Sequence, residues 1–401
     1  MWPIALAALT VVVAAVLPAA ARAATRADAG VPPTGRWEGE LTGGAPSGHL
    51  GNPGHNVPLL GNGYLGVVLQ SSPDGVGTHG YDFNGSTLEM FLNTNANWDC
   101  EKSSVEGALP PALCSMRGLG GLTLNLKNST VAGVALSGVN RTIFVAEQRL
   151  RNGSLWTERR AGNSFFRSET IVHPDRNVLL TTLEYSGLTA IELELQLWVL
   201  GRTSHVRSSV TSSCNMTSTG VATCSRRYNP ANVTGFVSPW TALGNRVVGK
   251  HDLVRSALLE EVCVNRFECV STATSVYRVQ PGQVFQFITT ASDNLLQGNA
   301  HDPASDAATL AQETAPGTVV DASSAFWRSY WNASGVLLPT RPALERMWYG
   351  AQYATVGAAA SAETVMRMKG KLPPPGLYGP FATGDFAFWN GDFTLDYNQE
   401  V

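Results

Sequence analysis

The sequence has no extended run of lysine or arginine, and its formal net charge at pH 7 is only -3 over 401 residues. Its basic side chains are scattered, so the positive surface that a nucleic-acid-binding protein needs is missing. The histidines lack H-x-x-x-H or similar ligand spacing, and no G-x-S-x-G segment occurs. These absences argue against zinc hydrolases and serine hydrolases. We expect no metal, no cofactor and no nucleic-acid partner.

Long apolar runs are also missing, except at the N-terminus. Residues 4–17 are apolar, Pro18 follows, and Ala21-Arg22-Ala23 has the A-x-A pattern of a cleavage site. This pattern predicts a signal peptide over residues 1–23. Residues 1–3 carry no basic side chain, so an uncleaved signal anchor stays an alternative. Because no later segment is long and apolar enough to span a bilayer, we expect a secreted or secretory-pathway lumenal protein without another membrane segment.

Two further features favour export. Seven asparagines open an N-x-Ser/Thr glycosylation acceptor, namely Asn84, Asn128, Asn140, Asn152, Asn215, Asn232 and Asn332. The six cysteines form three near-neighbour pairs, which are Cys100 with Cys114, Cys214 with Cys224, and Cys263 with Cys269. Such pairs suit disulfides that tie hairpins in an oxidising compartment, although six cysteines allow about 15 pairings. A metal site would need the tighter C-x-x-C spacing, which is absent.

Residues 30–293 predict a β-rich domain. Short runs of β-branched and aromatic residues alternate with turn residues from Leu60 to about Ala291, and residues 191–200 carry apolar side chains at alternate positions. Alternation of this kind means that a strand has one buried face and one wetter face. So much regular β structure indicates a large antiparallel sandwich.

The composition changes near Asn294, where helix formers replace strand formers. Residues 302–311 and the segment from Asp321 have acidic or serine caps and predict a helical linker over residues 294–340. A second helix is expected from Pro342 to about Lys369, because apolar residues recur on one stripe and proline suits the first turn. The Gly/Ala-rich stretch at residues 357–360 would allow another segment to approach this helix closely.

Residues 61–66, G-N-G-Y-L-G, match the G-x-G-x-x-G fingerprint of dinucleotide-binding proteins. That fingerprint needs a strand before it and a helix after it, whereas Pro58 precedes this segment and the strand-like residues 67–69 follow. We therefore predict a tight turn that leads into a strand, in which the glycines permit positive φ angles.

The tryptophans differ in their surroundings. Trp327, Trp331 and Trp348 lie at helical spacing, which favours core or interdomain packing over sugar stacking. Trp389 stands in a Gly-rich loop beside Asn390 and Asp392, where packing and sugar stacking are equally open.

The chain ends with W-N-G-D-F-T-L-D-Y-N-Q-E over residues 389–400, followed by one valine. Aromatic rings suit the apolar face of a pyranose, while amides and acids hold hydroxyl groups and transfer protons. Asp396, Asn398 and Glu400 alternate, so in an extended segment all three would point into one pocket. The alternative is a capped helix start with solvated acids.

Three parts of the chain resemble the α-L-fucosidases of glycoside hydrolase family 95 and their six-hairpin relatives. Residues 61–66 match the family's G-N-G-x-L-G, residues 374–379 its P-x-x-L-x-G, and residues 389–400 its W-N-x-x-[YF]-T-x-N-x-N-x-E; residues 326–339 are more loosely similar. The resemblance implies an N-terminal antiparallel β-supersandwich, a helical linker and an (α/α)6 barrel. Residues 341–401 would then form the first hairpin of a truncated barrel.

The resemblance also implies that a glycosidic bond is hydrolysed with inversion. In the family, the two amides of N-x-N hold the attacking water, and a later glutamate protonates the leaving oxygen. The first amide is replaced here by Asp396, whose carboxylate would itself serve as the general base, and Asn398 is retained. This departure affects the expected fucose specificity more than the expected glycosidase ancestry. We expect Asp396 and Asn398 to be catalytic, and the substrate-binding residues to be Trp389, Asn390, Asp392 and Glu400.

Inversion needs two groups on opposite faces of the sugar, about 6.5–9.5 Å apart, and only the water side is expected before Val401. A general acid typically contributes about 10² to 10⁴ in rate, so we expect this chain alone to be inactive or nearly so. Two alternatives stay open. One is a six-hairpin disaccharide phosphorylase, which uses phosphate in place of water, and the other is a non-catalytic secreted carbohydrate-binding glycoprotein. The expected partner is an oligosaccharide or glycoconjugate, and no oligomeric state is predicted.

Overall fold

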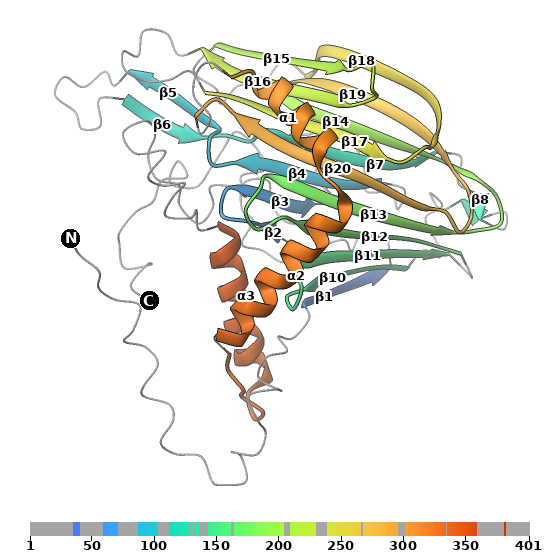
Figure 1. The fold of residues 1–401 in the computed structure, drawn as a ribbon, viewed down its shortest axis with the longest axis vertical. Coiled ribbons are helices and arrows are strands. Elements are labelled where there is room, and N and C mark those ends of the chain that lie inside the picture. Colours follow the sequence, from blue (N-terminus) through green and yellow to red (C-terminus); the bar gives the residue numbers. More distant parts are fainter. Residues whose placement is uncertain are drawn as a thin grey trace.

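The computed structural model describes residues 35–40, 59–70, 87–102, 112–127, 130–131, 134–135, 143–161, 164–203, 209–229, 239–265, 268–295, 301–333, 335–358 and 381. These residues form two large antiparallel sheets, two short ribbons and the helices α1, α2 and α3 (Figure 1). The predicted antiparallel β architecture is confirmed. Of the barrel hairpin expected over residues 341–401, only residues 341–358 and Phe381 are described, and the barrel stays a prediction.

The larger sheet has nine strands. Its order is β1 (Gly35–Glu40), β10 (Ile143–Arg149), β11 (Ser154–Ala161), β12 (Ser164–Val172), β13 (Val178–Ser186), β20 (Val284–Asp293), β17 (Trp240–Val248), β16 (Ala222–Asn229) and β15 (Ser209–Met216). The second sheet has seven strands, in the order β18 (Asp252–Asn265), β19 (Glu268–Val279), β14 (Ile191–Thr203), β7 (Gly120–Lys127), β4 (Thr87–Thr94), β3 (Leu65–Gln70) and β2 (Leu59–Gly61). The ribbons are β5 (Trp98–Lys102) with β6 (Ala112–Met116) and β8 (Thr130–Val131) with β9 (Val134–Ala135).

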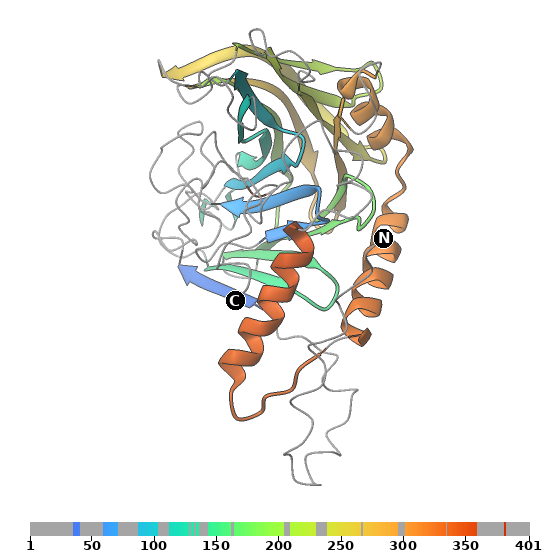
Figure 2. The ribbon, with the colours of Figure 1, turned by 90° about the vertical axis from the view of Figure 1, so that its left-hand side faces the viewer.

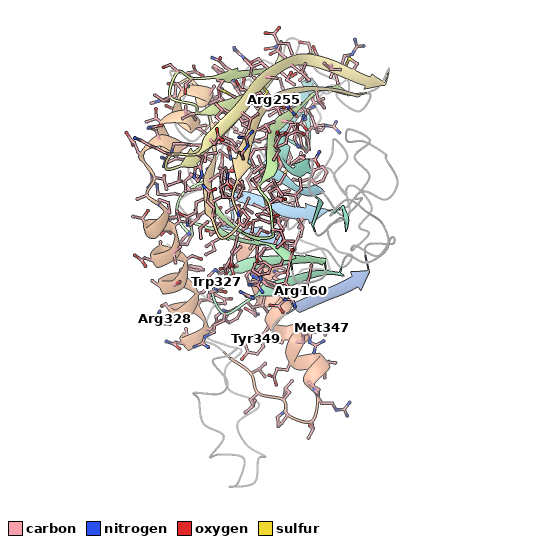
Figure 3. The ribbon with its side chains drawn as sticks, turned by 90° about the vertical axis from the view of Figure 1, so that its right-hand side faces the viewer. Arg160, Arg255, Trp327, Arg328, Met347 and Tyr349 are labelled. Carbon is pink, nitrogen blue, oxygen red and sulfur yellow. A yellow bond between two sulfur atoms is a disulfide. The ribbon has the colours of Figure 1, made fainter. Side chains whose placement is uncertain are left out.

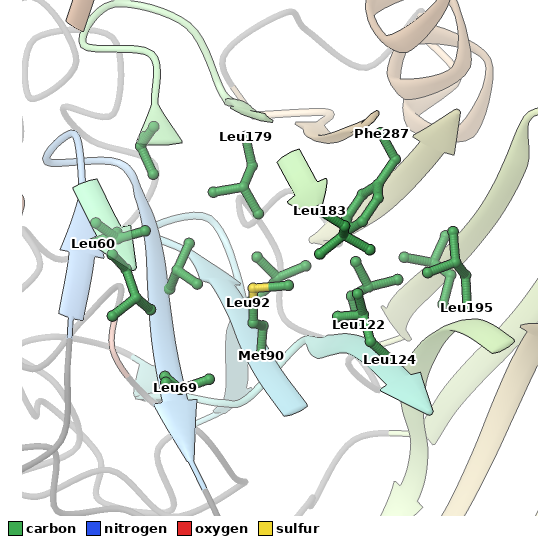
Figure 4. Close-up of a cluster of buried hydrophobic side chains, with 14 of the residues drawn as sticks. Leu60, Leu69, Met90, Leu92, Leu122, Leu124, Leu179, Leu183, Leu195 and Phe287 are labelled. Carbon is green, nitrogen blue, oxygen red and sulfur yellow. The ribbon is translucent and has the colours of Figure 1, made fainter. Parts of the chain in front are cut away.

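The main core lies between the two sheets. Leu195 of β14 and Leu122 and Leu124 of β7 belong to the same buried cluster as Leu183 of β13 and Phe287 of β20 (Figure 4). Each such side chain contributes about 1.5–3 kcal/mol when it is fully buried. The alternation predicted for residues 191–200 is therefore confirmed, because the apolar residues at positions 191, 193, 195, 197 and 199 face this core, whereas Trp198 and Leu200 belong to the cluster on the other face of the sheet.

α1 (Pro303–Glu313) lies against the nine-stranded sheet (Figure 2). Its N-cap Asp302 accepts a hydrogen bond from the Ala304 amide at 3.0 Å. On the sheet side, Arg246 Nε donates to the Ala311 carbonyl at 2.6 Å, and Thr290 Oγ1 donates to the Ala307 carbonyl at 2.7 Å. The helix predicted at residues 302–311 is confirmed, and hydrogen bonds to its carbonyls, of which the one from Arg246 is charge-assisted, fix it on the sheet.

α2 (Pro316–Ala333) and α3 (Pro342–Ala358) pack on each other through aromatic rings (Figure 3). The ring centroids of Trp327 and Tyr353 lie 4.7 Å apart, and those of Trp331 and Tyr349 lie 5.3 Å apart. Trp331 Nε1 also donates to the Leu150 carbonyl in the β10–β11 turn at 2.7 Å. Both predicted helices are confirmed, and so is core packing for Trp327 and Trp331. The expected extension of the second helix to Lys369 lies outside the described residues.

Two of the expected disulfides are present. Cys214 is bonded to Cys224 between β15 and β16, and Cys263 is bonded to Cys269 between β18 and β19. The backbones of Cys100 and Cys114 are register partners in the β5–β6 ribbon, and their side chains lie outside the description.

Within the described part of the chain, no helix is long and apolar enough to cross a membrane.

Candidate functional site

The residues of the predicted saccharide site all lie outside the described ranges. These are Asp396 and Asn398, expected to be catalytic, and Trp389, Asn390, Asp392 and Glu400, expected to bind substrate. Their roles stay predictions. Phe381, which precedes residues 389–400 in the sequence, is described. It shows where the chain that leads to the predicted site contacts the sandwich. We call that region the junction, and it comprises residues 59–65, 93–99, 293–295, 357–358 and Phe381.

Phe381 packs on the face of the seven-stranded sheet opposite the main core. It is buried in a cluster with Ala358 of α3, Val68 of β3 and the aromatic pair Phe91 and Trp198. The rings of that pair meet edge to face, with their centroids 5.4 Å apart. Removal of these apolar surfaces from water holds Phe381 against the sheet. The segment expected to carry the sugar site therefore starts from a residue anchored on the sandwich.

The turn at residues 61–65 is fixed by Asn62. Asn62 Oδ1 accepts from the Tyr64 amide at 3.0 Å and the Leu65 amide at 2.8 Å, as in turns closed by an asparagine side chain. Its Nδ2 donates to the His173 carbonyl at 3.1 Å in the β12–β13 turn. The backbone angle φ of Gly63 is positive, at 82°. Strand β3 follows the turn, whereas a dinucleotide fingerprint needs a helix at this place. The predicted turn into a strand is confirmed.

The C-terminal end of α3 approaches this turn closely. The Gly63 amide donates to the Gly357 carbonyl at 2.9 Å, and a Cβ placed on Gly61 would lie only 2.3 Å from the same oxygen. A side chain at position 61 is therefore incompatible with this contact. The close approach expected for the Gly/Ala-rich part of the helix is confirmed at Gly357.

Tyr64 connects the turn to the end of the last strand. Its phenol donates to Asp293 Oδ2 at 2.6 Å, and both side chains are buried. Burial first, and then the negative charge of Asp293, raise the pKa of Tyr64 well above its usual value of 10.0, so the phenol stays protonated. Asp293 Oδ1 accepts from the Leu295 amide at 2.8 Å, where the chain leaves β20. The end of β20, from which the chain continues into the helices, is thus hydrogen-bonded to the turn at residues 61–65.

The loop between β4 and β5 completes the junction. Asn95 Nδ2 donates to the Gly63 carbonyl at 2.6 Å, and Trp98 Nε1 donates to the Asn95 carbonyl at 2.8 Å. Asn97 Nδ2 donates to the Arg117 carbonyl at 2.7 Å, and Arg117 pairs with Asp99 at 3.4 Å. All of these side chains are buried.

This loop was not predicted from the sequence. A signal was available, because residues 93, 95, 97 and 99 read Asn, Asn, Asn and Asp at alternate positions of N-T-N-A-N-W-D. Loop asparagines are usually solvated, and only the folded structure shows that the side-chain amides of Asn95 and Asn97 donate to backbone carbonyls of distant segments.

Three of the seven glycosylation candidates are described. Asn215 and Asn332 are exposed. Asn152 is half-buried, its Oδ1 accepts from Ser154 Oγ at 3.1 Å, and Ser154 is buried. The other four, Asn84, Asn128, Asn140 and Asn232, lie outside the described residues.

In the described part, no group of three or more His, Cys, Asp or Glu side chains is arranged to hold a metal ion.

No protein-family model and no curated protein matches the chain. Among solved structures, a protein assigned as a kojibiose phosphorylase from the human microbiome aligns over 75% of this chain and 39% of its own length, with TM-score 0.50 and 10% identity. A family GH92 α-mannosidase from Bacteroides thetaiotaomicron aligns over 79% and 40%, with TM-score 0.36 and 10% identity. A bacterial glucoamylase complexed with acarbose aligns over 81% and 44%, with TM-score 0.39 and 9% identity.

The chain spans only 39% to 44% of the length of these three proteins. At 10% identity and TM-score 0.50, the first alignment indicates a shared fold and no more. The described sandwich and its helices share the fold of part of that kojibiose phosphorylase.

Proposed function

We propose that the chain is the N-terminal portion of a secreted glycoside hydrolase related to family 95. In this proposal residues 1–23 are a signal peptide, residues 30–293 the supersandwich, residues 294–340 the linker, and residues 341–401 the start of an (α/α)6 catalytic domain. The observation that carries the proposal is the fold shared with a kojibiose phosphorylase, together with an anchored chain at Phe381 just before the W-N-x-x-F-T segment. The two disulfides support an oxidising compartment.

The proposed reaction is inverting hydrolysis of an oligosaccharide or glycoconjugate. Asp396 takes a proton from water while Asn398 orients that water, whose oxygen forms a bond to the anomeric carbon. The glycosidic C–O bond breaks on the opposite face, and the leaving oxygen receives a proton from a general acid in a later part of the barrel. Trp389 stacks on the sugar, while Asn390, Asp392 and Glu400 bind its hydroxyl groups.

A second candidate function is phosphorolysis of a disaccharide. It is favoured by the kojibiose phosphorylase fold, since phosphate replaces the attacking water in such a reaction. In this case the water-activating role of Asp396 would be unnecessary, and its carboxylate would repel the phosphate.

One experiment separates these functions. The secreted protein that contains this chain is incubated with a panel of oligosaccharides, with and without inorganic phosphate, and the products are followed by NMR. Hydrolysis predicts free sugar of inverted anomeric configuration in phosphate-free buffer. Sugar phosphate that appears only with phosphate would replace the hydrolase by the phosphorylase. Saturable sugar binding without turnover in either buffer would refute both and indicate a binding glycoprotein.

A further inference from the structure

We propose that Asn215 carries an N-linked oligosaccharide and that this sugar keeps other strands from pairing with the free edge of β15. The inference rests on the secretion that the proposed function includes, because the secretory pathway supplies the sugar donor. β15 is the last strand of the nine-stranded sheet (Figure 1), and no described strand pairs with its outer side. Its backbone therefore offers unpaired amide and carbonyl groups to another chain.

The other three sheet edges carry features that hinder the addition of a strand. β1 has three charged residues among its six, namely Arg36, Glu38 and Glu40. β2 has only three residues. The pairing of β18 with β19 is interrupted by register shifts, and β18 contains four charged residues, which are Asp252, Arg255, Glu260 and Glu261. Charges, short length and irregular pairing each protect an edge strand.

β15 has none of these protections. Its eight residues, S-V-T-S-S-C-N-M, include no charged residue and no proline. The strand pairs with β16 in an unbroken register from Ser209 to Met216. It does contain Asn215, which is the only one of the three described glycosylation candidates that lies in a strand. A bulky, solubilising sugar at this residue would supply the protection that the strand otherwise lacks.

The side chain of Asn215 is accessible for this modification. It is exposed, and its register partner Thr223 pairs in turn with Gly244, beneath α1, so Asn215 points to the outer face of the sheet. Asn215 Oδ1 accepts from the Met216 amide at 2.7 Å. Among the described residues nothing accepts from Nδ2, the atom that would receive the sugar. Residues 218–220, which follow the acceptor motif, are exposed as well.

Asn152 has the opposite environment. Its Oδ1 accepts from the hydroxyl of Ser154, which belongs to the same acceptor motif and is buried. The Asn152 carbonyl accepts from Ser323 Oγ of α2 at 3.2 Å, and a Cβ on Gly153 would collide with Trp327 of the same helix. Because α2 covers this turn, a sugar on Asn152 would compete with the packing of the helix. Of the two, Asn215 is the residue that the folded protein can present.

The modification transfers an oligosaccharide from a lipid diphosphate donor. The anomeric carbon of the first sugar forms a bond to Nδ2 of Asn215, and its bond to the diphosphate oxygen breaks. One amide proton leaves with the lipid diphosphate, so the product is a neutral amide. Thr217 completes the N-x-Thr motif that this transfer requires.

Mass spectrometry of the 401-residue chain expressed in eukaryotic cells tests the site. Peptide N-glycosidase converts each modified asparagine into aspartate, and we expect this conversion at Asn215. Thr217→Ala should abolish the modification, whereas Thr217→Ser keeps a hydroxyl and should retain it. Sugar on other asparagines but not on Asn215 would overturn this inference alone. A chain that carries no sugar and stays inside the cell would overturn the proposed secretion as well.

Sedimentation equilibrium tests the role of the sugar. Asn215→Gln should raise the constant for self-association about tenfold, because it leaves the edge uncovered. Enzymatic removal of the sugar from the folded wild type should have the same effect. Asn332→Gln is the matched control, because Asn332 is exposed in α2, away from any sheet edge, and its loss should leave self-association unchanged.

A charge on the edge should replace the sugar. Asn215→Lys cannot be glycosylated but places an ammonium group on β15, so this variant should self-associate no more than the wild type. Circular dichroism checks that each variant is folded. Self-association that is unchanged after removal of the sugar would overturn the protective role, and so would Asn215→Lys that associates as strongly as Asn215→Gln.

Discussion

The phenol of Tyr64 and the carboxylate of Asp293 meet at 2.6 Å inside the protein, although 229 positions separate them in the sequence. Tyr64 belongs to the turn that receives the end of α3, and Asp293 lies where the chain leaves the sandwich for the helices. This hydrogen bond therefore joins the two points at which the helices connect to the sheets. A bond to a charged acceptor is among the stronger kinds in proteins.

The first prediction concerns that bond. Tyr64→Phe keeps the ring and removes the donor to a buried carboxylate, which should lower the free energy of unfolding by about 1.5–3 kcal/mol. Denaturant unfolding of the wild type and the variant measures the change. Tyr185→Phe is the matched control, because its phenol donates to the neutral Thr189 carbonyl at 2.9 Å and should cost only about 0.5–1.5 kcal/mol. Equal losses in both variants would contradict a special role for Asp293.

The second prediction concerns alkaline pH. Burial raises the pKa of both Tyr64 and Tyr353 above the usual value of 10.0, so the folded state keeps their protons when the unfolded chain releases them. The stability from each phenol is complete below the unfolded pKa and decreases as pH rises from about 10 toward the folded pKa.

Urea unfolding at increasing pH measures this decrease. Tyr353→Phe should reduce the slope of unfolding free energy against pH by up to about 1.4 kcal/mol per pH unit above pH 10. An unchanged slope would mean that Tyr353 ionises equally in both states.

The third prediction concerns the contact between the turn and α3. Gly61→Ala places a methyl group against the Gly357 backbone and should cost about 1–3 kcal/mol through overpacking. Thermal unfolding measures the loss, and proteolysis near the end of α3 should become faster. Gly350→Ala is the control, because Gly350 lies in α3 like Gly357 and a Cβ there meets nothing within 4 Å. This substitution should raise the free energy of unfolding by about 0.5–1 kcal/mol. A neutral Gly61→Ala would show that the helix end moves away freely.

The fourth prediction rests on the proposed hydrolase. In the protein that carries the complete helical domain, Asp396→Asn should lower kcat by about 10² to 10⁴ if the carboxylate is the general base. Asp392→Asn is the matched control at an expected hydroxyl-binding position, so it should change KM more than kcat. Steady-state kinetics distinguish the two, and an unchanged kcat in Asp396→Asn would remove the role assigned to that residue.

Local patterns in the sequence were sufficient to locate several of the secondary-structure elements of this protein. Apolar alternation located β14, caps and proline located α1 and α3, and close spacing paired Cys214 with Cys224. Each of these depends on neighbours within a strand, a helix turn or a hairpin, and such neighbours are close in the sequence as well. The roles of Asp396 and Asn398 stay predictions that rest on the resemblance.

Periodicity and capping are local properties, so the amino-acid sequence alone was enough to predict an antiparallel sandwich followed by helices. The burial of Asn95 and Asn97, the contact of Gly357 with Gly61 and the exposed position of β18 at a sheet edge were visible only in the folded protein. These features depend on which distant strands become neighbours. Strand order and the meeting of distant polar groups follow from how the whole chain buries its apolar faces, which no short segment encodes.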